Sequence, residues 1–273
     1  MSPFETLTES EWERVEQVWR LIEKGELDSA RRDLTGLQHE RGRHPDLGIV
    51  DAALHLEAGE PQDALEALHG AERSADPAQF FHLRALAHFE LVQLESARDD
   101  AERAITVNPA LAEAHELLSR VYEHLGDETQ SAVHATTAQD LDAESFPGAL
   151  EVSDEDFDEL VEQALGELPE RVRNELHEVR VLVQPLPERH VLTGGTPPLP
   201  PDILGLFVGR HLMERSHSDL PDEPPAIYLF RRNLLRSCAD RDELAREIRI
   251  TLQHEVGHLL GLDEDELEEW GLA

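Results

Sequence analysis

Short helix-breaking turns recur in the N-terminal half of the chain with a period of about 34 residues. The turns span Lys24–Leu27, Ala58–Pro61, Leu91–Leu94 and Leu125–Glu128, so their starts are 34, 33 and 34 residues apart. A small residue follows each turn at the same distance: Ala30, Ala64, Ala97 and Ser131. Such a period is typical of stacked helix–turn–helix units, in which small side chains let neighbouring helices pack closely. The first half of the chain is therefore predicted to be an all-α solenoid.

The unit from Ala112 to Ala143 shows most clearly which family the repeat resembles. It carries the residues typical of the tetratricopeptide repeat (TPR): Leu118, Ser119, Tyr122, Gly126, Asp127 and Ala138. The resemblance extends over about Glu9 to Ala143, and we assign residues 1–147 to a solenoid of about four helix hairpins. It implies a concave groove that binds a peptide or a partner protein. The alternative is a solenoid that serves only as a spacer or an oligomer interface.

Histidines recur through the predicted repeat helices: His55, His82, His88, His115 and His134. No two of them form a metal-binding pair with a carboxylate nearby in the sequence. We therefore expect them to be ordinary helix residues.

A second feature lies near the C-terminus, where residues 251–264 read TLQHEVGHLLGLDE. His254 and His258 are four residues apart, so in a helix both rings project from one face and can bind one metal ion. Glu255 lies about 100° further round the helix, close enough to face a water molecule bound to that metal. Gly261 is expected to end the helix in a left-handed conformation. The alternative is an exposed helix face of histidine and glutamate with a glycine cap.

These residues resemble the motif H-E-x-x-H-x-x-G-x-x-D of the minimal zincin-like metallopeptidases. The resemblance implies that Zn²⁺ is bound by His254, His258 and the residue at position 264, with Glu255 as the general base. The family has aspartate at that position, whereas this chain has Glu264. Glu264 is the favoured third ligand, and its neighbour Asp263 is the alternative.

The resemblance to the zincin-like family covers about Ser153 to Ala273, and we assign residues 148–273 to this domain. Strands are predicted at 179–183, 204–208 and 226–230, ahead of the helix that carries the histidines. This order suits a zincin, in which the metal-binding helix packs on a small twisted sheet. The predicted fold class is thus an all-α TPR-like solenoid followed by a small α+β zincin-like domain with a short sheet.

The charge balance is strongly acidic, with 59 Asp and Glu against 24 Lys and Arg and a formal net charge of -35. Such a surface repels phosphate backbones, so nucleic acid is not expected as a partner. The preference for arginine over lysine is associated with bacterial sources. The single cysteine, Cys238, suits a reducing cytoplasm, and neither a signal peptide nor a membrane-spanning run is seen. We expect a cytoplasmic protein that does not bind membranes.

Together these features predict a zinc-dependent metallopeptidase that hydrolyses peptide bonds with metal-activated water and the Glu255 base. The repeats would recruit the substrate or a partner protein. The alternative is a non-catalytic TPR adaptor whose zincin domain binds metal without turnover.

Overall fold

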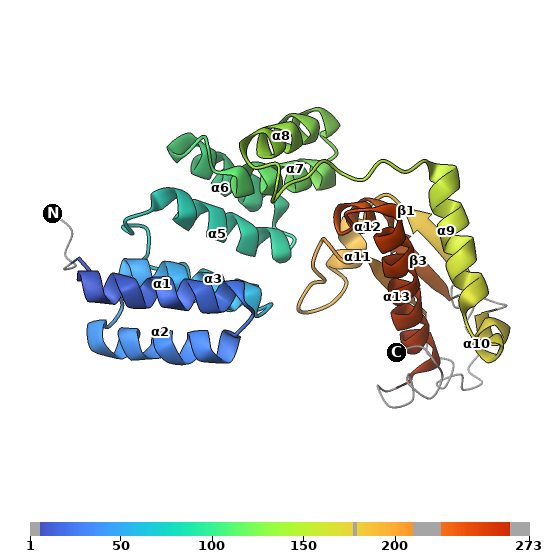
Figure 1. Ribbon diagram of the computed structural model, residues 1–273, viewed down its shortest axis with the longest axis horizontal. Helices are drawn as coiled ribbons and strands as arrows, with labels where there is room; N and C mark the ends of the chain where they lie inside the picture. Colours follow the sequence, from blue (N-terminus) through green and yellow to red (C-terminus); the bar gives the residue numbers. More distant parts are fainter. Residues whose placement is uncertain (1–5, 177–178, 210–224, 263–273) are drawn as a thin grey trace. The chain divides into compact units, whose positions relative to one another are not determined.

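The computed structural model describes residues 6–176, 179–209 and 225–262 (Figure 1). In the N-terminal part of these ranges, consecutive helices pack against each other in pairs. The helices are α1 (Glu9–Glu23), α2 (Leu27–Arg41), α3 (Pro45–Glu57), α4 (Pro61–Leu68), α5 (Pro77–Glu90), α6 (Leu94–Val107), α7 (Ala112–Leu125) and α8 (Glu128–Leu141). The all-α N-terminal fold that the repeat period predicted is confirmed.

The recurring turns that connect the two helices of each pair share one backbone conformation and one hydrogen bond. Each turn contains a residue in the left-handed conformation: Gly25, Gly59, Val92 and Gly126, with φ of 70°, 70°, 58° and 79°. The following N–H group donates to the carbonyl five residues earlier, as from Glu60 N to His55 O at 2.8 Å. This bond satisfies a carbonyl that the ending helix leaves unpaired. Glycine adopts the conformation without steric penalty, whereas β-branched Val92 is strained there.

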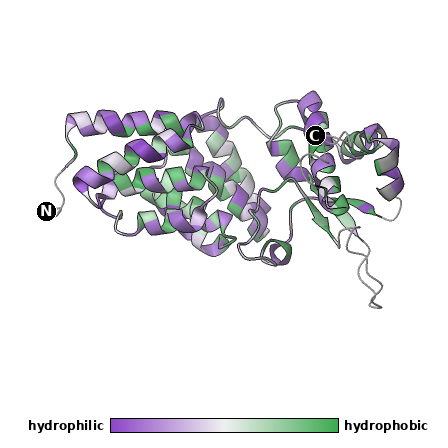
Figure 2. Ribbon diagram, turned by 90° about the horizontal axis from the view of Figure 1, so that it is seen from below, coloured by the Kyte–Doolittle hydropathy of each residue, from purple (hydrophilic) through white to green (hydrophobic). Residues whose placement is uncertain are grey.

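The small residues after the turns pack in the interior of the solenoid. Ala30, Ala64 and Ala97 have no exposed surface, which lets the helices of neighbouring units approach closely. Apolar residues gather between the helices, while polar residues cover their outer faces (Figure 2). The second pair differs from the others because α4 has 8 residues, whereas α2, α6 and α8 have 15, 14 and 14.

The C-terminal part of the described residues combines helices with a three-stranded sheet. Its elements are α9 (Asp154–Glu167), α10 (Glu170–Glu175), β1 (Arg180–Gln184), α11 (Arg189–Leu192), β2 (Gly205–Val208), β3 (Ala226–Phe230), α12 (Arg231–Arg236) and α13 (Arg241–Leu260). The strand order is β1-β3-β2, with β1 parallel and β2 antiparallel to β3. Each strand lies within one residue of its predicted range, and the predicted α+β class is confirmed.

Helix α13 packs against β2 and β3 and also against α9. Its apolar residues recur every fourth position, and Leu244, Ile248 and Leu252 have no exposed surface. They join Phe157 of α9 and Ile227 of β3 in one hydrophobic core. This core fixes the position of α13 against the sheet. It thereby also fixes where the polar residues in the last two turns of the helix lie relative to the strands.

Contacts between Cα atoms divide the chain into two compact units. One unit is Met1–Gly148 with Leu192–Pro200, and the other is Ala149–Val191 with Pro201–Ala273. Among the described residues, we find no helix whose length and apolarity would suffice to span a bilayer.

We expect a fragment from Ser153 to the C-terminus to fold alone and to bind about one zinc ion, because all the fully buried residues of the core around α13, from Phe157 to Leu260, belong to that fragment. Far-ultraviolet circular dichroism and zinc titration of the purified fragment would check both expectations. A fragment that is unfolded, while the whole chain is folded, would show that the domain boundary at 147/148 is wrong.

Candidate metal centre

Helix α13 places the two histidines and the glutamate in its last two turns. The helix begins after Asp240, whose side chain accepts the N–H of Glu243 at 2.8 Å. It ends at Gly261, which has φ 68° in the left-handed region, and Leu262 N then donates to Gly257 O at 3.1 Å. The end of the helix thus lies where the sequence predicted it, three residues after His258.

The rings of His254 and His258 lie on one exposed face of α13. Their Nε2 atoms are 3.0 Å apart, and the ring centroids are 4.5 Å apart. Two nitrogen ligands in tetrahedral coordination to zinc would be separated by roughly 3.3 Å, given bonds of about 2.05 Å. The two nitrogens therefore need to move only slightly to share one ion. Imidazole nitrogens are also ligands that zinc prefers, so this pair fits the metal that the sequence predicted.

Glu255 lies on the side of α13 that faces the sheet. Only 7% of its surface is exposed, and its Oε2 accepts the backbone N–H of Phe207 in β2 at 2.7 Å. Burial raises the pKa of Glu255, while the bond from Phe207 and the nearby histidines lower it to a smaller extent. The carboxylate is thus anchored at one oxygen by a strand that is 48 residues away in the sequence.

Gly205, the first residue of β2, allows the strand to approach α13 this closely. A Cβ atom at position 205 would lie 2.6 Å from Thr251 Cγ2 and 3.1 Å from Glu255 Cγ. Both distances are shorter than normal van der Waals contacts, so only glycine fits. Gly205 was not among the residues predicted to form the site. Its signal is a glycine within a predicted strand, which often marks a close approach of another part of the chain.

The remaining predicted site residues, Glu264 and Asp263, lie outside the described residues. The structure therefore brings together His254, Glu255 and His258 on one helix end. The identity of the third ligand stays a prediction.

Two solved structures overlap the N-terminal helices. A crystal structure of MamA is 21% identical, with a TM-score of 0.40, and the match covers 45% of this chain and 73% of that chain. The MamA RS-1 ArsTM double mutant is 20% identical, with a TM-score of 0.41, covering 49% of this chain and 76% of that chain. No curated protein matches the chain.

The C-terminal part of the chain matches a family of known proteins. Residues 176–272 match the model of the zincin-like metallopeptidase family. This range contains β1, β2, β3 and the whole of α13 with its paired histidines. The family implies a metal ion, typically zinc. The C-terminal part of this chain is therefore similar to the zincin-like metallopeptidases over residues 176–272.

Proposed function

We propose that the C-terminal domain is a zinc-dependent peptidase that hydrolyses peptide bonds with Glu255 as its general base. His254, His258 and Glu264 would hold the metal. The observation that carries the proposal is the anchoring of Glu255 beside the histidine pair. A glutamate that merely belonged to an exposed helix face would lie in solvent. Glu255 is instead buried and accepts a hydrogen bond from the backbone of β2.

The anchoring gives the two carboxylate oxygens of Glu255 different roles. Oε2 accepts the N–H of Phe207, so Oε1 is the oxygen that receives a proton. Glu255 would take this proton from the attacking water and then deliver it to the leaving amine. Because the carboxylate is held by the backbone, it does not need to reorient between the two transfers. Zinc bound at the histidines would polarise the peptide carbonyl and acidify the attacking water.

The repeats would recruit the substrate or a partner protein. A pocket of about 350 Å³ lies between α1, α3 and the start of α5. Its lining includes Trp12, Trp19 and Ile49, and the ring of Trp12 is partly exposed. Aromatic side chains in such a groove supply contact area at a small entropic penalty, which suits the binding of an apolar segment of a protein.

The test of the proposal is a peptidase assay of the full chain against a peptide library. Activity should be lost when zinc is removed by a chelator and should return when zinc is added back. If the protein cleaves nothing across a broad library and still binds a partner through its repeats, the adaptor function would replace the peptidase function.

The third ligand can be assigned by comparing two neighbouring carboxylates. We expect Glu264→Ala to weaken zinc binding at the histidine pair more than Asp263→Ala does, because Glu264 occupies the position of the family's ligand. Competition with a chromophoric chelator would measure both affinities, and the reverse order would give the role to Asp263.

A further inference from the structure

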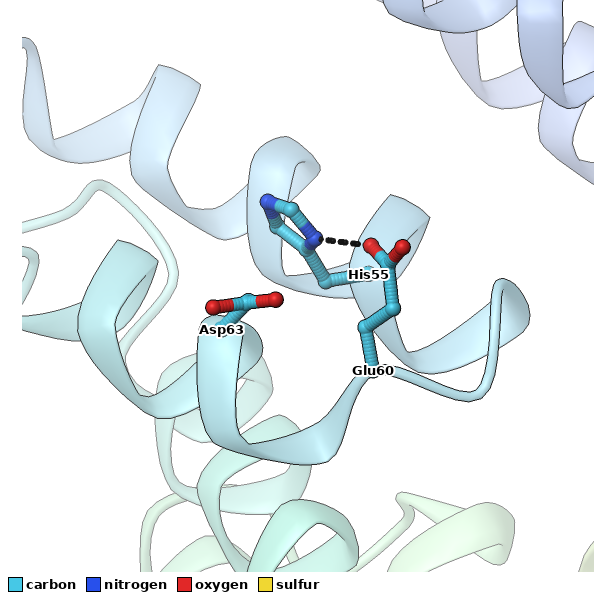
Figure 3. A group of neighbouring side chains, drawn as sticks. All are labelled: His55, Glu60 and Asp63. Carbon is cyan, nitrogen blue, oxygen red and sulfur yellow. Dashed lines mark hydrogen bonds and ion pairs between the residues drawn. The ribbon is translucent and has the colours of Figure 1, made fainter.

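The second repeat brings together three side chains of types that can bind metal ions, of which His55 was expected to be an ordinary helix residue. His55 lies in the last turn of α3, Glu60 immediately precedes α4, and Asp63 lies in the first turn of α4 (Figure 3). One donor atom from each of the three lies within 4.8 Å of the others. His55 and Asp63 also line a pocket of about 720 Å³, and Asp51 lines the same pocket.

His55 has a carboxylate at each of its ring nitrogens. Nδ1 lies 2.7 Å from Glu60 Oε2, and Nε2 lies 3.7 Å from Asp51 Oδ1. A neutral imidazole carries one N–H group and one lone pair. Whichever nitrogen carries the N–H group, the other directs its lone pair at a carboxylate, a repulsion that a bound proton or a bound metal cation relieves. A cation placed between these groups turns that repulsion into attraction.

The third repeat has the same turn but different side chains at the equivalent positions. Positions 33 residues further on hold Arg84, His88, Gln93 and Ser96 in place of Asp51, His55, Glu60 and Asp63. His88 Nδ1 lies 2.6 Å from Gln93 Oε1, so the contact between the histidine and the turn is preserved. The arginine makes two bonds of 2.6 Å to a buried aspartate, Asp100.

The second repeat thus has acidic residues where the third has an arginine, an amide and a hydroxyl. Packing of the turn does not require this change, because the third repeat makes the same turn without it. Arg31 of α2 bonds one oxygen of Glu60 at 3.0 Å. Arg43 lines the same pocket, so two guanidinium groups stand against the three carboxylates of Asp51, Glu60 and Asp63, and the cluster keeps excess negative charge.

We propose that this cluster is a second metal site, which binds a divalent transition-metal ion through His55, Glu60 and Asp63. The carboxylate of Asp51 would add to the attraction. An imidazole nitrogen combined with carboxylate oxygens favours Zn²⁺ and its neighbours over Ca²⁺ and Mg²⁺, which prefer oxygen ligands alone. The ion would connect the end of α3 to the start of α4, which is the shortest helix of the solenoid.

The test uses the full chain with His254→Ala and His258→Ala, which remove the C-terminal site. Both side chains are exposed, so the fold should persist. Titration with Zn²⁺ against a chromophoric chelator should show one remaining tight equivalent. Asp63→Ser, which copies the third repeat, should weaken that affinity by at least about 10–100-fold, the loss typical even of residues that only support a ligand.

Two further variants make the result specific. Asp51→Arg also copies the third repeat and should weaken zinc binding to a similar extent, because it supplies the missing positive charge. His88→Gln removes a histidine from the third repeat and should leave the affinity unchanged. Circular dichroism would confirm that each variant is folded, and if Asp51→Arg unfolds, Asp63→Ser decides alone.

Two outcomes would overturn the proposal. One is the absence of stoichiometric zinc from the chain that lacks His254 and His258. The other is zinc binding that Asp63→Ser does not weaken, which would mean that the acidic surface holds the ion without a defined site.

Discussion

Glu255→Gln should lower the peptidase activity by about 10²–10⁴-fold, the range that general-base catalysis contributes, while zinc stays bound. Glutamine has nearly the same size as glutamate, and its amide oxygen can still accept the N–H of Phe207. The anchoring of the side chain to β2 is therefore retained, and the ability to take a proton is lost. Measurements of kcat/KM and of zinc content on the same preparation would separate these two properties.

A matched control for this variant lies on the same helix. Glu247→Gln makes the same chemical change two turns earlier in α13 and should leave the activity unchanged. Binding of a partner through the repeats should survive in both variants, because the repeats belong to the other unit. Equal cleavage by Glu255→Gln and the unchanged protein would refute the assignment of Glu255 as the base.

Gly205→Ala should lower the activity by about 10²-fold, because a displacement of about 1 Å in a catalytic group can have an effect of this size. The new methyl group would lie 2.6 Å from Thr251 Cγ2, so β2 and α13 must separate. This separation would weaken the bond between Phe207 and Glu255. Overpacking of this kind also lowers the free energy of unfolding by about 1–3 kcal/mol. Kinetics and urea unfolding would measure the two effects.

A second substitution tests whether the steric contact is the cause. Thr251→Ser removes the Cγ2 methyl group, so the double variant Gly205→Ala with Thr251→Ser should recover part of the lost activity and stability. Gly166→Ala in α9 is the control, because a Cβ atom there meets nothing within 4 Å. If Thr251→Ser restores neither property, the glycine is required for another reason.

The sequence predicted much of the fold because the strongest signals are local. Turn residues at a spacing of about 34 predicted the helix pairs, and Gly261 predicted where α13 ends. The third turn shows the limit of this reasoning, since Val92 takes the left-handed position that glycine holds in the other three. Its strain is tolerated because the packing of α5 against α6 over-determines the turn.

The cluster in the second repeat was missed for a different reason. His55, Glu60 and Asp63 come from a helix end, a turn and the next helix start, so no single periodicity puts them on one face. A signal was present in the sequence. When the second and third repeats are aligned, Asp51 is equivalent to Arg84 and Asp63 is equivalent to Ser96. A reversal of charge between equivalent positions indicates that one repeat has a property that the other lacks.

The sequence by itself determined which residues of α13 share a face, because the helical period places His254 and His258 together whatever surrounds them. Only the tertiary structure determined that Glu255 is buried and accepts a hydrogen bond from a strand. Its partner, Phe207, and the glycine that admits it lie on a strand 48–50 residues away, and no local pattern relates the two segments. Side-chain spacing along a helix follows from backbone geometry. The distance between that helix and a strand depends on the packing of the whole core, in which Leu252 and Ile227 are two of many buried side chains.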